Sequence, residues 1–90
     1  MAERFEDGFA GRVAVLTGGG TGMGRELVRQ LTADGCDVAI CDVLIDNAEE
    51  TASICREAAN PGSMLTFAAD VSIEAQVQAF AAAVASWWRT

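Results

Sequence analysis

The 90-residue sequence contains no lysine, no histidine and no tyrosine, and it has a single proline. Without lysine there is no Walker loop, because that loop ends in Gly-Lys-Ser or Gly-Lys-Thr. Without histidine, the three cysteines lack the partner that often completes a zinc site. Basic residues are also scarce: six arginines stand against thirteen acids, for a formal net charge of −7. This balance argues against nucleic acid and anionic membranes as partners, because both are negatively charged.

The cysteines, Cys36, Cys41 and Cys55, are odd in number and form no C-x-x-C pair. This usage is typical of small, buried, reduced residues in a cytoplasmic protein. The acidic residues 1–7 lack an apolar core and do not form a signal peptide. The longest uncharged stretch, 75–88, is too short to span a bilayer. We therefore expect a cytoplasmic protein with no membrane segment.

Glycine is concentrated in one place: five of the nine glycines lie within residues 17–24, which read TGGGTGMG. The apolar run 13–16 precedes this stretch, and a helical pattern follows it. Glycine lets another group approach the backbone, because no Cβ stands in the way. A helix that starts at such a turn directs free N–H groups and the positive end of its dipole toward it. The pattern favours a diphosphate site over the alternative, a flexible glycine loop or hairpin turn.

The spacing of these glycines is G-x-x-x-G-x-G, with Thr17 in front. It resembles the cofactor loop T-G-x-x-x-G-x-G of the short-chain dehydrogenase/reductase family, and the resemblance covers about residues 8–86. It implies a Rossmann-type domain that binds a nicotinamide dinucleotide. It also implies cofactor contacts from the loop residues Gly18, Gly20, Thr21, Gly22, Met23 and Gly24. Met23 stands where the family usually has isoleucine.

Hydrophobic periodicity divides the chain, after a lead-in over residues 1–10, into alternating strands and helices. The predicted strands cover about 12–17, 37–42 and 64–69, and the predicted helices about 23–34, 46–59 and 73–88. The first strand, helix and strand, 12–42, have the length of a mononucleotide-binding βαβ unit. The expected fold class is α/β: a three-layer, Rossmann-type parallel sheet with the order β-α-β-α-β-α, which is an incomplete doubly wound fold. Residues 1–90 would be the N-terminal part of a single NAD(P)-binding domain.

Local signals predict where these elements end. Gly35 supplies a left-handed stop after the first helix. Asp46 or Asn47 is the expected cap of the second helix, and Ser72 that of the third. The turn 60–63 is predicted to be type II, with its glycine at positive φ.

Helical spacing predicts which side chains the helices bury. The expected faces are Met23, Leu27, Val28 and Leu31 in the first helix, Ala48, Ala52, Cys55 and Ala59 in the second, and Ile73, Val77, Phe80, Val84 and Trp88 in the third. Trp87 and Trp88 are adjacent, so they cannot both face one core. We expect one of the two to be exposed or to cover something outside this chain.

Asp42 ends the second predicted strand and indicates which cofactor the chain binds. A carboxylate there can accept hydrogen bonds from both ribose hydroxyls of an adenosine whose diphosphate lies on the glycine loop. No basic residue lies between Arg29 and Arg56, so a 2′-phosphate would meet acids and no arginine fork. NAD is therefore favoured over NADP. The alternative is a strand-end aspartate without a ligand.

Three further residues complete the predicted cofactor site: Val43, which follows Asp42, and the pair Asp70 and Val71. In the family an Asp-Val pair lines the adenine pocket, with the acid accepting from the adenine amino group, and the resemblance implies that role here. The competing interpretation is that Asp70 initiates the third helix. No catalytic residue and no metal ligand is predicted in this chain.

The family's chemistry depends on an Asn-Ala-Gly strand end, a serine and a Tyr-x-x-x-Lys pair, and this chain has no tyrosine and no lysine. The resemblance therefore implies the NAD(P)-binding half of a hydride-transfer oxidoreductase, acting on an alcohol or carbonyl substrate in its full-length form. The chain itself is interpreted as a fragment or truncated product, inactive alone. Two alternatives stay open: a non-catalytic nucleotide-binding module and, less favoured, half of an S-adenosylmethionine-binding methyltransferase.

The resemblance also implies the strand order third, second, first, with the first strand meant for the middle of a larger sheet. The first two helices would then cover one face of the sheet and the third helix the other. The outer edge of the first strand would have no partner and would carry an apolar surface. We therefore expect self-association, or a homo-oligomer, through this strand.

Overall fold

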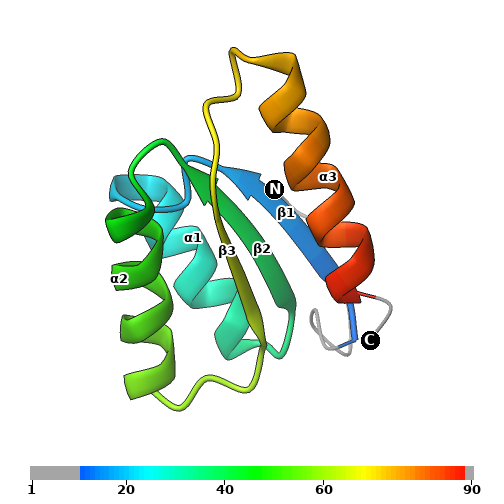
Figure 1. The fold of residues 1–90 in the computed structure, drawn as a ribbon. Helices are drawn as coiled ribbons and strands as arrows, with labels where there is room; N and C mark the ends of the chain where they lie inside the picture. The colour runs from blue at the N-terminus through cyan, green and yellow to red at the C-terminus, as the bar shows by residue number, and fades with distance from the viewer. Residues whose placement is uncertain (1–10, 89–90) are drawn as a thin grey trace, which may run out of the picture.

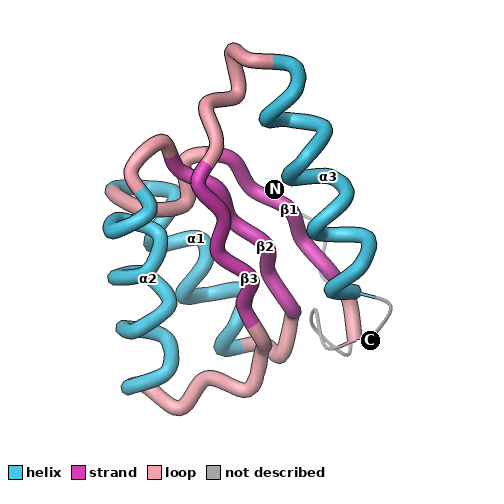
Figure 2. The backbone as a smooth tube through the Cα atoms, in the orientation of Figure 1, coloured by secondary structure: helices cyan, strands magenta, loops and turns pink. Residues whose placement is uncertain are grey.

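The computed structural model describes residues 11–88, so the lead-in predicted over 1–10 lies outside the described residues. Strands and helices alternate along the chain as predicted, with ends shifted by a residue or two (Figures 1 and 2). They are β1 (Val13–Thr17), α1 (Gly22–Ala33), β2 (Asp37–Asp42), α2 (Ile45–Glu57), β3 (Met64–Ala68) and α3 (Glu74–Trp88). Within residues 11–88, no helix combines the length and apolar character needed to cross a membrane.

The three strands form a parallel sheet in the order β1-β2-β3, which confirms the predicted order. In its register, Val13 lies opposite Asp37, and Val38 lies opposite Met64. The ladder continues past the strand ends, because Gly18 N donates to the carbonyl of Cys41 at 2.9 Å. The carboxyl ends of all three strands therefore meet along one edge of the sheet.

Successive side chains of the central strand β2 enter two separate cores. Val38 and Ile40 are fully buried on the face covered by α1 and α2, and Ala39 and Cys41 are buried on the face covered by α3 (Figure 1). This arrangement confirms the predicted division of the helices between the faces. Burying a valine or isoleucine side chain stabilises the fold by about 1.5–3 kcal/mol. Because β2 buries side chains on both faces of the sheet, this strand stabilises the packing of the helices on both faces.

The buried face of α1 differs from the predicted one. Val28 and Thr32 are completely buried, whereas Met23 is 90% exposed and Leu27 is 44% exposed. The Thr32 hydroxyl is satisfied inside the core, because it donates to the Val28 carbonyl at 2.8 Å. A hydrophobic pattern does not count a threonine as a buried residue, even when a local hydrogen bond satisfies its hydroxyl. The buried face of α1 therefore contains Val28 and Thr32 and excludes Met23.

The other two helices follow their predicted faces in part. In α2, Ala48, Ala52 and Cys55 are buried, but Ala59 lies beyond the helix end and is exposed. In α3, Phe80 is buried against Phe67 of β3, with ring centroids 5.6 Å apart.

The two tryptophans divide as expected, with one of them exposed. Trp87 packs against the core beneath α3, and Trp88 is 64% exposed. The core-facing member is therefore Trp87 and not Trp88, which helical spacing had placed on the buried stripe.

The predicted stop at Gly35 is confirmed by its φ of +87°, but the type II turn at 60–63 is wrong. The positive φ in this segment belongs to Ala59, at +57°, and not to Gly62. Gly62 is needed for space instead, because a Cβ on it would overlap the carbonyl of Cys36 and the Cα of Thr32. Its N–H also donates to the carbonyl of Thr32 at 3.0 Å, which joins this turn to the end of α1.

The predicted caps of α2 and α3 are also corrected. Helix α2 begins at Ile45, ahead of Asp46 and Asn47, and its N-cap residue Leu44 offers no side-chain cap. The chain turns early because the Leu44 N–H donates to the side chain of Asp42. Helix α3 begins at Glu74, and the preceding Ser72 hydroxyl donates to a carboxylate instead of capping the helix.

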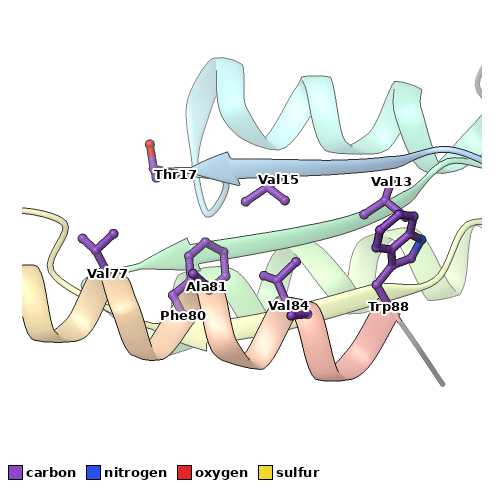
Figure 3. A pocket seen from close by; sticks show the side chains of 9 residues that line it. Val13, Val15, Thr17, Val77, Phe80, Ala81, Val84 and Trp88 are labelled. Atoms are coloured by element: carbon purple, nitrogen blue, oxygen red, sulfur yellow. The ribbon is translucent and has the colours of Figure 1, made fainter.

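One face of β1 lines an apolar groove beneath α3. Val13 and Val15 point from the strand toward the helix, and Thr17 lies at the end of the groove, which has a volume of about 600 Å³ (Figure 3). The remaining lining residues come from α3 and are Val77, Phe80, Ala81, Val84, Ala85 and Trp88. Val15 is 54% exposed, and within residues 11–88 β1 pairs only with β2. Strand β1 therefore presents both an unpaired backbone edge and uncovered apolar side chains.

We expect the isolated 90-residue chain to self-associate through β1 or to populate a loosely packed state, because an unpaired apolar edge strand invites further strand pairing. Sedimentation measures the association. Val15→Lys should reduce it by placing a charge on the strand, whereas Leu44→Lys, at an exposed loop residue outside β1, serves as the control. A sharp monomer with strong amide protection across residues 13–16 would contradict the expectation.

Candidate functional site

The glycine loop connects the end of β1 to the start of α1, and two of its glycines adopt backbone angles that other residues avoid. Gly18 has a φ of +72° and Gly22 a φ of +59°. These left-handed conformations turn the chain between the end of β1 and the start of α1. A side chain at either position would be strained.

The other glycines of the loop are required because neighbouring atoms lie where a Cβ would stand. At Gly24 that place is taken by the carbonyl oxygen of Gly18, so the first turn of α1 lies directly on the loop. At Gly20 it is taken by the Asp42 carboxylate. At Gly19, which was outside the predicted site, it is taken by the side chain of Ile40. The spacing of the glycines thus reflects close packing between strand, loop and helix.

The N-terminus of α1 is open to an anion. Its N-cap residue, Thr21, has an extended backbone and makes no side-chain cap, and the first turn contains no acidic residue. The first amides of a helix have no partner within the helix, and its N-terminus carries partial positive charge. This is the arrangement that receives a phosphate group in nucleotide-binding folds.

Five of the predicted site residues line one pocket of about 270 Å³ at the carboxyl ends of the strands. They are Gly18, Asp42, Val43, Asp70 and Val71, joined by Thr17, Cys41 and Ala69. The other five predicted residues do not line this pocket: Thr21, Gly22 and Met23 are exposed, Gly20 is buried and Gly24 is partly buried. The structure therefore separates this pocket from the more open loop and helix end beside it.

Asp42 is held at the boundary between pocket and loop. Its Oδ1 accepts a hydrogen bond from Leu44 N at 3.0 Å, and its Oδ2 lies against Gly20. The carboxylate therefore supports the loop and also lines the pocket at the strand ends.

Asp70 accepts two hydrogen bonds from Ser72, one from the backbone N–H at 2.9 Å and one from the hydroxyl at 2.7 Å. These donors lower the pKa of the Asp70 carboxyl, with the hydroxyl making the larger contribution. The carbonyl of Asp70 also accepts from Ile73 N at 3.0 Å, so this residue forms the turn that leads into α3. Asp70 thus combines a structural role before the helix with a place in the pocket.

The cysteines are free and buried, as expected. Burial raises the pKa of the Cys41 thiol, which lies at the pocket, and likewise that of Cys36. A raised pKa keeps a thiol protonated at neutral pH, and a protonated thiol is a poor nucleophile. Cys41 therefore contributes a buried, protonated thiol to the wall of the pocket.

Sequence reasoning missed two residues that hold the loop, Arg25 and Thr51. Arg25 Nη2 donates to the carbonyl of Gly20 at 2.6 Å, and Thr51 Oγ1 donates to the same oxygen at 3.1 Å. The signal for Thr51 was present, because it lies three residues after Ala48 on the buried side of α2. A polar residue on a buried stripe needs a partner, and the Thr51 hydroxyl has two acceptors within reach, the loop carbonyl of Gly20 and, at 3.2 Å, the Asn47 carbonyl of its own helix.

Residues 12–90 match the model of the family described as short chain dehydrogenase. The protein belongs to the short-chain dehydrogenase/reductase family, whose members bind nicotinamide dinucleotides. The glycine loop, the open helix end and the acid-lined pocket fit such a cofactor.

Among curated relatives, levodione reductase of Leifsonia aquatica is 40% identical over 83% of this chain and 28% of its own length. Dehydrogenase/reductase SDR family member 11 of Homo sapiens is 32% identical over 93% of this chain and 31% of its own length. The present chain thus spans less than a third of the length of these relatives.

Solved structures agree with these matches. The crystal structure of levodione reductase superimposes with a TM-score of 0.84 at 38% identity, covering 89% of this chain and 31% of that one. L-sorbose reductase from Gluconobacter frateurii, complexed with NADPH and L-sorbose, gives 0.82 at 27% identity, covering 91% and 31%. The fold is therefore that of the first part of such enzymes.

We expect Ser72→Ala to raise the pKa of Asp70 toward its ordinary value, because it removes the hydroxyl that donates to the carboxylate. A carboxyl with a depressed folded-state pKa contributes stability that is present above its unfolded pKa and is lost as the pH falls through the folded pKa. The variant should lose that contribution at a higher pH than the wild type. Carboxyl titration by NMR measures the pKa of Asp70 in the variant and in the wild type, with Ser63→Ala as the control. An unchanged Asp70 titration would contradict the assignment.

Proposed function

We propose that these 90 residues supply the dinucleotide-binding part of an oxidoreductase that transfers hydride between NAD and an alcohol or carbonyl substrate. One observation carries the proposal: the glycine loop, the open N-terminus of α1 and the pocket between Asp42 and Asp70 meet at the carboxyl ends of the strands. In parallel α/β sheets, ligands bind at this edge.

The roles of the site residues follow from their places. The diphosphate lies on the loop, against Gly18 and Gly20 and the first amides of α1, with Thr21, Gly22 and Met23 bordering it. Gly24 lets the helix approach the loop closely enough for this. Asp42 accepts from the ribose hydroxyls, with Val43 beside it.

The adenine occupies the pocket at the part lined by Asp70 and Val71, where the Asp70 carboxylate accepts a hydrogen bond from the adenine amino group. An aspartate is ionised at neutral pH, and the depressed pKa of Asp70 keeps its carboxylate an acceptor down to lower pH than an ordinary aspartate.

The preference for NAD over NADP rests on this chain's own residues. Asp42 would repel a 2′-phosphate, and the cation nearest the loop, Arg25, is already bonded to Gly20 and Glu50. The structurally similar L-sorbose reductase was solved with NADPH, so membership of the family does not decide between the cofactors.

A second candidate function is a non-catalytic nucleotide-binding module. The 90 residues contain no tyrosine and no lysine, the residue types that the family's acid and its electrostatic helper need, so they fit this candidate as well as the first. The two candidates differ in residues that the 90-residue sequence does not contain, and reading the gene beyond codon 90 for a Tyr-x-x-x-Lys frame distinguishes them. Half of an S-adenosylmethionine-dependent methyltransferase is disfavoured by the family match.

The buried, free cysteines favour a reducing location such as the cytoplasm.

We expect the chain to bind NAD or its adenosine half weakly, more tightly than NADP, and to bind S-adenosylmethionine less well than either. Calorimetric or NMR titration of the three ligands measures this order. Tighter binding of S-adenosylmethionine would overturn the proposed function. Tighter binding of NADP would overturn only the argument from Asp42.

Asp42→Ala should weaken NAD binding at least about tenfold, because hydrogen bonds to a charged acceptor contribute about 1.5–3 kcal/mol each. It should also reduce the discrimination against NADP. Asp42→Asn separates charge from shape, since its amide oxygen can still accept from Leu44 N. Asp46→Ala, which removes an exposed acid from the first turn of α2, is the matched control and should leave NAD affinity unchanged. Unchanged NAD affinity in Asp42→Ala would make this residue a strand-end aspartate only.

A further inference from the structure

The carbonyl oxygen of Gly20 is tied to two helices at once. It accepts hydrogen bonds from Arg25 Nη2 at 2.6 Å and from Thr51 Oγ1 at 3.1 Å. Arg25 Nε also donates to Thr51 Oγ1 at 3.0 Å, which closes a triangle of hydrogen bonds. Arg25 belongs to α1 and Thr51 to α2, so one loop carbonyl joins the two helices that cover this face of the sheet.

Burial and charge restrain this triangle, in which the Thr51 hydroxyl also has the Asn47 carbonyl of its own helix at 3.2 Å. Thr51 is completely buried, and the Arg25 side chain is only 23% exposed. The remaining arm of the guanidinium, Nη1, pairs with Glu50 Oε1 at 3.2 Å. The planar guanidinium presents its N–H groups as a fixed fork, so a single side chain reaches three acceptors, whereas a lysine ammonium would not reach them together.

Fixing this carbonyl also fixes the amide that follows it. The described chain has no cis peptide bond, so the Thr21 N–H points opposite to the Gly20 C=O. Because the carbonyl faces Arg25 and Thr51, the Thr21 amide faces away from them. Gly20 is also the residue that touches the Asp42 carboxylate, so the same triangle sets the separation between the loop and that acid.

We propose that Arg25 and Thr51 are positioning residues for the dinucleotide, which clamp the Gly20 carbonyl and thereby hold the loop in the form that receives the diphosphate. The inference rests on the proposed function, because it takes a dinucleotide as the ligand of the loop. The clamp has a second consequence for specificity: the Arg25 guanidinium is committed to protein acceptors and is withheld from a 2′-phosphate.

The first test measures the affinity of the 90-residue chain for ADP and for adenosine by calorimetric or NMR titration. Thr51→Val keeps the shape of the buried side chain but removes the hydroxyl, and it should weaken ADP about five- to tenfold while leaving adenosine unchanged. Thr51→Ser retains the hydroxyl and should bind ADP as the wild type does. The matched control is Thr66→Val, because Thr66 donates to Glu49 at 2.9 Å on the exposed side of α2.

A parallel pair of variants tests the arginine. Arg25→Lys should weaken ADP to a similar extent, because lysine keeps the charge and loses the fork. Arg29→Lys is its control, since Arg29 pairs with Glu26 at the exposed surface of the same helix. Unchanged ADP affinity in both Thr51→Val and Arg25→Lys would overturn the proposal, and so would equal losses for ADP and adenosine, which indicate general damage to the fold.

A second measurement needs no ligand. Nitrogen-15 relaxation should show increased motion of the amides at 19–23 in Thr51→Val, with no change across 38–41 of the central strand. Loop amides as rigid as in the wild type would overturn the clamp. If the wild-type chain binds neither ADP nor NAD, the proposed function fails, and the relaxation measurement alone decides whether the clamp exists.

Discussion

The contact between the first turn of α1 and the end of β1 is the constraint on which the site depends. The carbonyl of Gly18 occupies the space that a side chain at position 24 would need, so the helix begins in direct contact with the loop. This closeness leaves the first amides of α1 at the loop, with no side-chain cap on Thr21. The crossover then continues into β2 and ends at Asp42, beside Gly20. A single close approach thus places the open N-terminus of α1 and the Asp42 carboxylate, the groups proposed to bind phosphate and ribose, on the same edge of the sheet.

The fold could be predicted from the sequence because its strongest signals are short-ranged and agree with one another. An apolar run, a glycine turn and a helical pattern specify a βαβ unit, and the second half of the chain repeats the alternation. Asp42 and Asp70 were placed correctly at the strand ends because parallel strands align their carboxyl ends at one edge. The family pattern supplied the strand order, which periodicity alone does not contain.

The errors share a physical cause, which is that polar side chains and backbone contacts across the chain do not appear in a hydrophobic pattern. Thr32 occupies a core position that periodicity reserves for an apolar residue, and the exposed Met23 had been assigned to the buried face in consequence. Gly62 was assigned to a type II turn, but it is needed because a carbonyl from a distant segment lies beside it. The bond from Thr51 to Gly20 joins residues far apart in the sequence, so no local window contains it, and the bond from Arg25 is a polar contact that leaves no mark in a hydrophobic pattern.

Asp42 has a consequence for how such a chain can evolve. Its carboxylate contacts Gly20 and accepts from the Leu44 amide, so the group that would distinguish one cofactor from another also shapes the surrounding backbone. A mutation that alters selectivity at this position therefore alters loop geometry in the same step. A new cofactor preference would require compensating changes in the loop around Gly20, and the effect of each change would depend on the order in which the others arose. Such epistasis confines the accessible mutational routes to those in which the loop and the acid change together.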